Sequence, residues 1–559
     1  MRDNKKIVML TFSLIGIFFL VFLIFPLLTI FYQAFVSNST INLTNFKNLI
    51  SNSVIRTSFI DSLMISFQTS LLATLIGFVF AYCVNFTTVF KGCKSLIGTL
   101  IILPMLVPTI VYGFAIIYSF GKQGIITRLV GFQLFDIYST QGLILGFLIY
   151  TVPIAYLLFN NAMSYIDHQY FIVSDIMGDS KLRRFWVTII SPLITTIAIS
   201  IVQTFFLTFT DFGIPASLAG SKNLMATTLY NQMIGSVPDF ANGSILALMM
   251  LFPALFSALL LFRLKRFEIR YDKRRTFLLT RNRPRDAFIF LLTASYLLIT
   301  VATFCSFIIV PFVTNYPYNL TWTFEHISSV LSNSDLIATY LNTIEMSILT
   351  SILGIILAYT CALLVKRSIL NPMLCRVIEG LSQLTIAIPG MVLGLAFIFA
   401  FSKTSLHYTL AILVIVNLIH FFATPFNLAN QALEKMSDHY EQTASLLGDS
   451  YIRLLVRVII PNSKQTLVEM FSYLFTNAMV TISAIIFLVG AHTATMTTKI
   501  KELQHFNKFD DIFILALLLL LTNLTVKYVI YLVFTKEKKS FKQVLKVDKL
   551  STLQVKKGA

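Results

Sequence analysis

The chain has 559 residues, of which 56% are hydrophobic and 12% charged, and its formal net charge is +18. An ordinary soluble domain carries roughly a quarter charged residues, so the polar residues here are too few to cover a globular surface. The composition excludes a soluble globular protein. The five cysteines are odd in number and show no CxxC spacing, so neither a disulfide framework nor a metal site is expected.

Long apolar stretches without any charge recur along the chain. Val8–Tyr32 and Ser62–Phe90 are two of them, and each exceeds the roughly 20 residues that a helix needs to cross a bilayer. We predict an all-α integral membrane fold with about twelve transmembrane helices, near residues 8–32, 60–84, 97–119, 141–160, 189–213, 242–262, 287–312, 340–365, 378–401, 408–428, 466–490 and 511–534.

Basic residues are distributed unequally between the two sides of this predicted fold. Segments on the amino-terminal side hold 33 of the 43 Lys and Arg residues, the opposite loops hold nine, and Lys527 lies within the last span. Basic loops face the cytoplasm, so we predict a multi-pass membrane protein with both termini cytoplasmic. Residues 263–285, with ten Lys and Arg, are interpreted as a loop beside anionic lipid rather than a nucleic-acid site.

The basic loop divides the chain into halves that resemble each other. "GFVFAY" from Gly77 returns as "GIILAY" from Gly354, and "PTIVYGFAIIYSF" from Pro108 returns as "PGMVLGLAFIFAF" from Pro389. Six spans per half predict two homologous units around a pseudo-twofold axis, with a pathway between them. The predicted parts are a first half, a basic cytoplasmic linker, a second half and a basic cytoplasmic tail, at residues 1–262, 263–286, 287–535 and 536–559.

Two predicted cytoplasmic loops, 270 residues apart, carry the most informative motif. "SDIMGDSKLRRFWVTIISP" follows the fourth span and "ASLLGDSYIRLLVRVIIP" follows the tenth. Each predicts a short helix that ends in a left-handed glycine, then a second short helix with an Asp or Ser N-cap. A repeated loop of this kind indicates a docking surface. The candidate docking residues are Ser174, Gly178, Asp179, Ser180, Arg183, Gln442, Ala444, Gly448, Asp449, Ser450, Arg453 and Pro461.

These loops resemble the EAA loop of binding-protein-dependent ABC importer permeases, whose pattern is roughly E-A-A-x-x-x-G, nine residues, I-x-L-P. The second loop keeps the spacing from Gly448 to Pro461 but has Gln442-Thr443-Ala444 in place of Glu-Ala-Ala, with Glu441 one residue early. The first loop has Ile172-Val173-Ser174 there, and its Pro192 comes one residue late.

The resemblance implies a type I importer fold, a place in the bacterial plasma (inner) membrane, and a transport subunit that is not an enzyme. It also implies two copies of a cytoplasmic ABC ATPase docked on the loops, and an extracytoplasmic binding protein that delivers a small solute. No G-x-x-x-x-G-K-[ST] phosphate loop occurs in the chain. We therefore expect no cofactor on this chain, and ATP with Mg²⁺ on the partner ATPase.

The substrate and its contacts are less closely defined by the sequence. The segments "FTDFGIPASLAG" and "TISAIIFLVG" look most like the 2-aminoethylphosphonate group of fused permeases, with ferric iron or thiamine as the alternative. Intramembrane ionisable residues are the usual pathway candidates, here Asp211 and Glu345. A twelve-helix secondary transporter is the alternative class, but it would leave the paired Gly-Asp-Ser loops unexplained. The seven His residues are scattered, which argues against a membrane enzyme.

Overall fold

The computed structural model describes residues 2–37, 40–41, 44–167, 169–218, 220, 222–235, 239–267, 282–368, 370–437 and 439–555. Within these residues, eight helices are long and apolar enough to cross a membrane, and up to eleven if each bent pair counts as one span. The one predicted span outside this count, residues 466–490, corresponds to α25, a helix of 17 residues. The all-α multi-pass membrane fold predicted from the sequence is thus confirmed, with a helix at each predicted span.

The first half runs from α1 to η4. Its elements are α1 (Arg2–Phe19), η1 (Leu20–Ile24), α2 (Phe25–Phe35), β1 (Val36–Ser37), β2 (Thr40–Ile41), α3 (Thr44–Ser51), α4 (Ser53–Phe86), α5 (Lys91–Leu100), η2 (Leu103–Leu106), α6 (Thr109–Phe120), α7 (Ile125–Val130), α8 (Thr140–Met163), α9 (Gln169–Ile176), α10 (Lys181–Phe185), η3 (Trp186–Ile190), α11 (Ser191–Thr210), α12 (Gly213–Ser217), α13 (Met225–Ile234), α14 (Phe240–Leu264) and η4 (Lys265–Phe267).

The second half repeats this order after the linker. Its elements are α15 (Arg283–Ile309), η5 (Val310–Phe312), β3 (Val313–Asn315), β4 (Asn319–Trp322), α16 (Glu325–Ser332), α17 (Ser334–Arg367), α18 (Pro372–Ala387), α19 (Gly390–Phe401), α20 (Leu410–His420), α21 (Ala423–Glu434), α22 (His439–Leu446), α23 (Tyr451–Leu454), η6 (Leu455–Ile459), α24 (Ile460–Asn462), α25 (Lys464–Val480), α26 (Met496–His505) and α27 (Phe509–Val555). Linker residues 268–281 and tail residues 556–559 lie outside the described residues, and α27 carries the predicted tail as helix to Val555.

The internal repeat extends to individual hydrogen bonds. The backbone N–H of Met225, at the start of α13, donates to Ser62 Oγ of α4 over 2.9 Å. At the equivalent place in the second half, Met496 N–H at the start of α26 donates to Thr343 Oγ1 of α17, also over 2.9 Å. The helices α4 and α17 are both 34 residues long. Two copies of one helical unit therefore make up the molecule.

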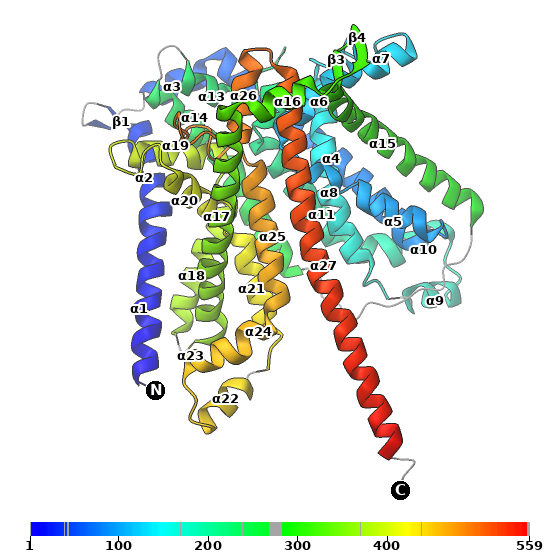
Figure 1. The fold of residues 1–559 in the computed structure, drawn as a ribbon, viewed down its shortest axis with the longest axis vertical. Coiled ribbons are helices and arrows are strands. Elements are labelled where there is room, and N and C mark those ends of the chain that lie inside the picture. The colour runs from blue at the N-terminus through cyan, green and yellow to red at the C-terminus, as the bar shows by residue number, and fades with distance from the viewer. Residues whose placement is uncertain are drawn as a thin grey trace.

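Each half packs its first helices against the other half. The helix α2 of the first half contacts α19 of the second, and α15, which opens the second half, contacts α6 of the first. Figure 1 shows α1 beside the yellow-green helices of the second half and α15 on the opposite flank. This exchange joins the halves along both edges of their interface.

The third and ninth predicted spans, residues 97–119 and 378–401, are broken rather than continuous. The chain bends by 110° before α6 and by 108° before α19. Pro108 and Pro389 stand at the two breaks, and the residues before them, Val107 and Ile388, are extended with ψ of 142° and 117°. A proline excludes helical geometry at the preceding residue, so the repeated "P" of both motifs starts a new helix.

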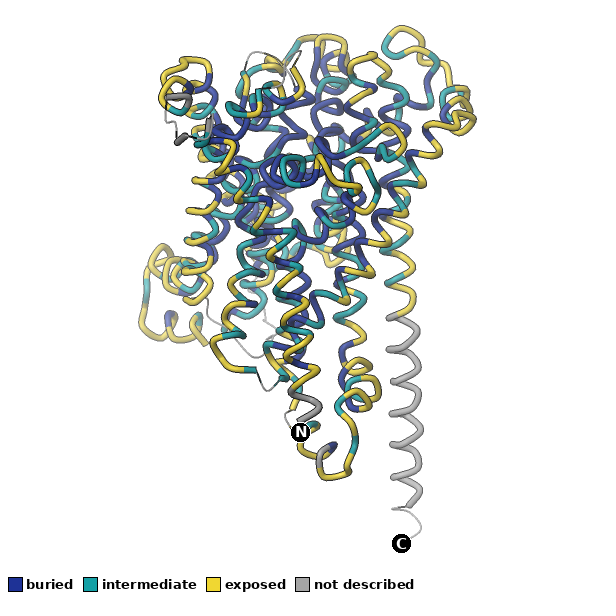
Figure 2. Tube along the Cα trace, turned by 90° about the vertical axis from the view of Figure 1, so that its left-hand side faces the viewer, coloured by how far each residue is buried: buried dark blue, intermediate teal, exposed yellow. Residues whose placement is uncertain are grey.

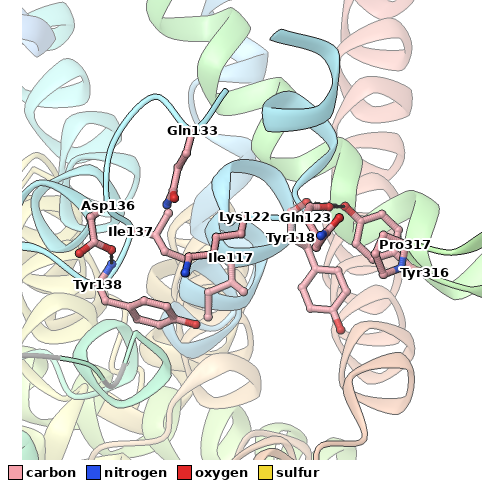
Figure 3. Close-up of a pocket in the computed structure, with 11 residues that line it drawn as sticks. Ile117, Tyr118, Lys122, Gln123, Gln133, Asp136, Ile137, Tyr138, Tyr316 and Pro317 are labelled. Atoms are coloured by element: carbon pink, nitrogen blue, oxygen red, sulfur yellow. Dashed lines mark hydrogen bonds between the residues drawn. The ribbon is translucent and has the colours of Figure 1, made fainter. Parts of the chain in front are cut away.

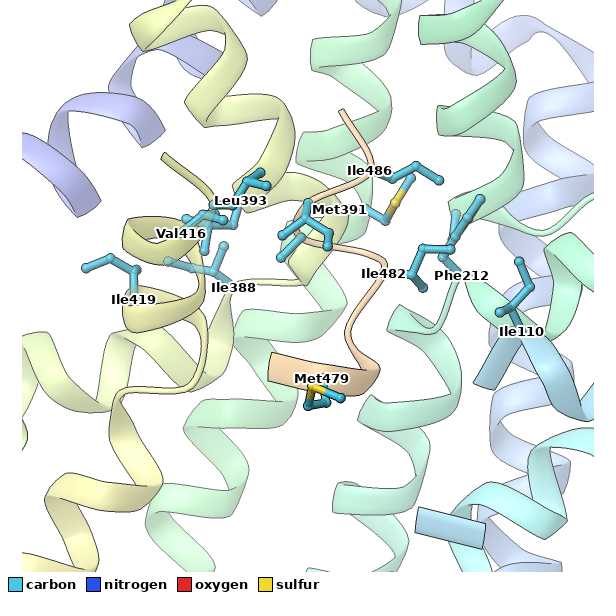
Figure 4. Packing of buried hydrophobic residues seen from close by; sticks show 14 of the residues in the cluster. Ile110, Phe212, Ile388, Met391, Leu393, Val416, Ile419, Met479, Ile482 and Ile486 are labelled. Atoms are coloured by element: carbon cyan, nitrogen blue, oxygen red, sulfur yellow. The ribbon is translucent and has the colours of Figure 1, made fainter. Parts of the chain in front are cut away.

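The eleventh predicted span, residues 466–490, is also shorter than expected, because α25 ends at Val480. The segment that follows packs closely on α19: a Cβ on Gly394 would lie 2.6 Å from the carbonyl oxygen of Ala484. The first half has a comparable close approach, where a Cβ on Gly113 of α6 would lie 2.0 Å from Ser217 Oγ of α12. Figure 4 shows Met391, Ile482 and Ile486 in the core that this packing creates.

The two ends of the molecule differ in packing. The lower end in Figure 1, called the loop end below, holds the start of α1, α22 and α23, with α9 at the lower right. The opposite end, called the far end, holds α3, α13, α16 and α26. Buried residues gather in the upper part of the view in Figure 2, toward the far end. The halves are therefore closely packed at the far end and more open toward the loop end.

Candidate functional site

The first candidate docking loop has the predicted helix–glycine–helix form. Gly178 has φ of +68° and ends α9 in the left-handed region, and Ser180 caps α10 by accepting the Arg183 N–H. Asp179 accepts from Ser174 Oγ at 2.8 Å and pairs with Arg183 Nε at 3.1 Å. The predicted left-handed glycine and serine N-cap are confirmed.

The second loop repeats this geometry residue by residue. Gly448 has φ of +71°, Ser450 caps α23 by accepting the Arg453 N–H, and Asp449 pairs with Arg453. Ala444 is buried, as is its equivalent Ser174 in the first loop. A π-helical turn follows in both copies, η3 and η6.

The remaining predicted loop residues lie at the margins of this turn. Gln442 is exposed, and its Oε1 lies 3.1 Å from His439 Nδ1, within hydrogen-bond distance. Pro461 occupies the first turn of α24, where its missing N–H is not needed. Both side chains are exposed, so they can contact a partner but do not hold the loop together.

Each loop presents large apolar side chains to solvent at equivalent positions. Ile176 and Leu446 are 80% and 88% exposed, and a second pair, Leu182 and Ile452, is 84% and 62% exposed. We call these four residues, together with Met177 and Leu447, the loop patches. Exposed apolar groups rimmed by Asp, Ser and Arg are typical of protein–protein contact surfaces. The geometry therefore favours two matched docking surfaces over two ordinary connections.

Different contacts fasten the two loops to the membrane helices. At the end of α17, the Arg367 side chain is only 4% exposed; it pairs with Glu441 at 3.2 Å and donates to the carbonyl oxygen of Leu433 at 2.6 Å. In the first half, Phe86 and Phe171 stand at the equivalent positions and their rings pack at 5.9 Å. An ion pair in one half thus takes the place of an aromatic pair in the other.

A cavity of ≈ 500 Å³, continuous in its lining with another of ≈ 420 Å³, lies between the halves. Its lining consists largely of residues in pairs exactly one repeat apart, so it straddles the pseudo-twofold axis. The pairs, 270 residues apart, are Tyr150 and His420, Ile154 and Thr424, Leu157 and Asn427, Leu158 and Leu428, Asn161 and Gln431, Gln203 and Tyr473, Leu207 and Asn477, Thr210 and Val480, and Asp211 and Thr481.

The two predicted pathway residues have different positions. Asp211, at the end of α11, lines the cavity and accepts hydrogen bonds from Thr109 Oγ1 at 2.8 Å and from the Ile214 N–H at 2.9 Å. Glu345 is exposed on α17 and is absent from the lining of this cavity, and Met64, its equivalent on α4, is 53% exposed. Glu345 therefore lies on an outward face and does not contact this cavity, and its role in a pathway stays a prediction.

Several lining residues were not predicted from the sequence, although a signal for them existed. The 270-residue offset that relates Gly178 to Gly448 also relates Tyr150 to His420 and Gln203 to Tyr473. Polar residues recurring at that offset within apolar spans would have indicated an axial lining.

At the far end, residues of both halves close the cavity. Lys501 Nζ of α26 donates to the carbonyl oxygen of Ala216 at 3.2 Å and lies 5.8 Å from the ring centroid of Tyr230, its equivalent on α13. Gln504 donates to the same carbonyl oxygen at 3.1 Å. Burial lowers the pKa of Lys501 to about 8. These contacts join the halves where the cavity ends.

A second, smaller pocket of ≈ 290 Å³ lies near the far end and is shown in Figure 3. Residues 117–138 supply nine of its lining side chains, and Tyr316 and Pro317 supply the others. Tyr316 donates to the carbonyl oxygens of Tyr118 and Gln123 at 3.0 and 2.9 Å. Because this pocket belongs mainly to one half, it does not lie on the axis, and the central cavity is the better pathway candidate.

The comparisons with known proteins agree with this geometry. Residues 350–539 match the family model described as "Binding-protein-dependent transport system inner membrane component". The chain is 24% identical over 528 residues to the ferric transport system permease protein of Actinobacillus pleuropneumoniae, covering 89% of this chain and 74% of that protein. It is also 24% identical over 521 residues to a protein of Haemophilus influenzae provisionally named a ferric transport system permease, covering 88% and 79%.

A third relative supports the two-half organisation. A protein of Helicosporidium, provisionally named a sulfate transport system permease, is 21% identical over 252 residues, which are 44% of this chain but 88% of the relative. A stretch of less than half of the present chain therefore corresponds to most of that relative. The alternative of a twelve-helix secondary transporter has no counterpart among these relatives. Residues 350–539 thus carry the domain of the binding-protein-dependent inner membrane components, and the similarity along nearly nine-tenths of the chain supports a transmembrane permease of the ABC importer type.

Proposed function

We propose that this permease imports ferric iron. The observation that carries the proposal is the similarity to two ferric transport permeases along nearly nine-tenths of the chain. The expected substrate, 2-aminoethylphosphonate, finds no support among these relatives, and neither does thiamine, so the alternative expectation is preferred. The cavity agrees with a cation: its described lining contains one carboxylate, Asp211, and its one lysine, Lys265, follows the last turn of α14. A phosphonate would need converging cationic donors.

We further propose that one cytoplasmic ABC ATPase binds each loop patch, giving two copies for each permease, and that a binding protein outside the membrane delivers the iron. The chain has no phosphate-binding motif of its own. ATP binding would draw the two ATPases together and move the loops with them. The Arg367–Glu441 and Phe86–Phe171 contacts would carry that motion into α17 and α4.

The orientation of the chain follows from the same proposal and from the distribution of basic residues: the loop end faces the cytoplasm. Single cysteines at Ile176, 80% exposed at the loop end, and at Tyr318, 79% exposed at the far end, are suitable probes in a cysteine-free variant that still transports. We expect an impermeant thiol reagent to label Tyr318→Cys in intact cells and Ile176→Cys only after the membrane is opened. Labelling of both from outside would contradict the orientation.

Uptake in cells tests the substrate. We expect deletion of the gene to abolish ⁵⁵Fe uptake from ferric citrate at micromolar iron, and the full-length gene to restore it. Growth on 2-aminoethylphosphonate as the phosphorus source is measured in the same strains as the control. If iron uptake persists in the deletion strain while growth on the phosphonate is lost, the original substrate expectation is right and the ferric proposal is wrong.

A further inference from the structure

We propose that Tyr150, Asp211, His420 and Tyr473 form a transient binding site for bare Fe³⁺ within the central cavity, an inference that rests on the proposed ferric function. All four residues line both parts of the cavity. The first half supplies Tyr150 and Asp211, and the second half supplies His420 and Tyr473. A cation held by all four would therefore bridge the two halves.

The four side chains come from the helices that surround the axis. Tyr150 lies on α8 and His420 ends α20, its equivalent; Tyr473 lies on α25, and Asp211 follows the last residue of α11. Tyr150 is close enough to both Asp211 and Tyr473 to interact with them electrostatically. Two phenols and one carboxylate thus lie near one another in the cavity lining.

His420 provides a second, independent observation. Its Nδ1 atom is buried and has no hydrogen-bond partner in the described structure, while its ring packs edge-on against Phe421 at 4.6 Å. A buried polar atom without a partner is costly unless something binds there. The imidazole borders the cavity, and imidazole nitrogen is a ligand that iron accepts.

The donor set can balance the charge of Fe³⁺. A carboxylate and two phenolates carry three negative charges, which equal the charge of the ion, and a neutral imidazole adds none. A cation inside the membrane is tolerated when its charge is matched locally. Binding of Fe³⁺ would displace one proton from each tyrosine, and these protons leave to the water of the cavity. A divalent cation would displace only one of them, so iron–phenolate bonds from both tyrosines are expected for Fe³⁺.

The remaining polar groups suit a site from which the ion can leave. Asp211 already accepts hydrogen bonds from Thr109 and Ile214, which compete with a metal for its oxygens. Tyr473 is hydrogen-bonded to Thr424, another lining residue. Ligands held partly by the protein bind an ion less tightly, as a transport pathway requires.

A spectroscopic titration of the full chain in lipid nanodiscs tests the site. Ferric nitrilotriacetate is added, and the visible charge-transfer band of an iron–phenolate bond is followed. We expect a saturable band with one iron per chain, and at least a tenfold weaker apparent affinity in Tyr150→Phe and in Tyr473→Phe. The matched control is Tyr296→Phe: this half-buried tyrosine donates to the Leu148 carbonyl oxygen at 3.0 Å and is absent from the cavity lining.

The outcomes separate the site from the function. No band in the wild-type chain, or an unchanged band in both cavity variants, overturns the site. If wild-type cells still take up ⁵⁵Fe, the ferric importer then stands without it. Absence of iron uptake by wild-type cells overturns the importer itself. Gel filtration of each variant shows whether loss of the band reflects loss of the folded protein. The variant His420→Gln keeps a polar group at that position and leaves both tyrosines intact, and it is expected to weaken the band.

Discussion

Replacing Gly448 by valine is expected to abolish transport while the protein remains in the membrane at its normal level. Gly448 has φ of +71°, and a Cβ there would meet no atom within 4 Å. The cost of the substitution is therefore confined to the backbone, roughly 1 kcal/mol or more for a left-handed residue with a side chain. That cost favours a different backbone conformation at this turn. The change would tilt α23 and move Ile452 away from Leu446 and Leu447, the other members of the second loop patch.

Two further variants show whether the effect belongs to the loop. Gly131, in a far-end turn, has φ of +87° and an equally open Cβ position, so Gly131→Val imposes similar strain away from the patches and should leave transport intact. Gly448→Asn should restore much of the activity, because asparagine tolerates the left-handed region. Gly178→Val should be harmful too, but less so, since the first loop departs further from the family pattern.

The measurements are uptake per inserted permease and co-purification of the ATPase. Loss of both in Gly448→Val supports the docking role. Normal uptake in both loop variants would remove that role, and lost uptake with a fully stimulated ATPase complex would place the function of these glycines elsewhere.

Removing the Arg367 side chain is the second change with a large expected effect. Arg367→Phe leaves Glu441 without its cation and deprives the carbonyl oxygens of Leu433 and Met436 of donors at the end of α21. A buried acceptor left unsatisfied costs about 1–3 kcal/mol. We expect the second loop to lose its fixed position on α17, with transport falling at least tenfold and trypsin cutting faster within 434–450.

The first half suggests how to repair this variant. Phe86 and Phe171 occupy the positions equivalent to Arg367 and Glu441 and pack on each other. The double variant Arg367→Phe, Glu441→Phe should therefore recover part of the lost transport, whereas Glu441→Phe alone should not transport normally. If the double variant transports no faster than Arg367→Phe, the aromatic pair cannot replace the ion pair in holding the loop on α17.

The sequence predicted the repeat and the docking loops because both depend on local signals. A glycine followed by Asp-Ser has few favourable backbone conformations, and the structure has the expected one at both Gly178 and Gly448. The breaks before Pro108 and Pro389 were visible as prolines, but long apolar runs on either side concealed them. The length of an apolar run indicates how much of the chain lies in the membrane. It does not indicate where the chain turns inside the membrane.

Side-chain direction was harder to predict than element position. Glu345 and Asp211 looked alike in sequence, as single acids near the ends of spans, yet one faces outward and the other lines the cavity. In a soluble helix the polar residues mark the exposed face. In a membrane helix the face exposed to lipid is also apolar. The amino-acid pattern of α17 therefore did not indicate which of its faces points outward.

The contact between Lys501 and Tyr230 has an evolutionary consequence. These residues are the same position in two copies of one ancestral unit, and they meet where the copies adjoin. In an assembly of two identical chains, any residue beside the axis faces its own duplicate, so a lysine there would face a second lysine. Fusion into one polypeptide lets each copy mutate alone. A cation can then lie over an aromatic ring, and a tyrosine can lie opposite a histidine. Two identical chains could not place different residues at equivalent positions beside the axis.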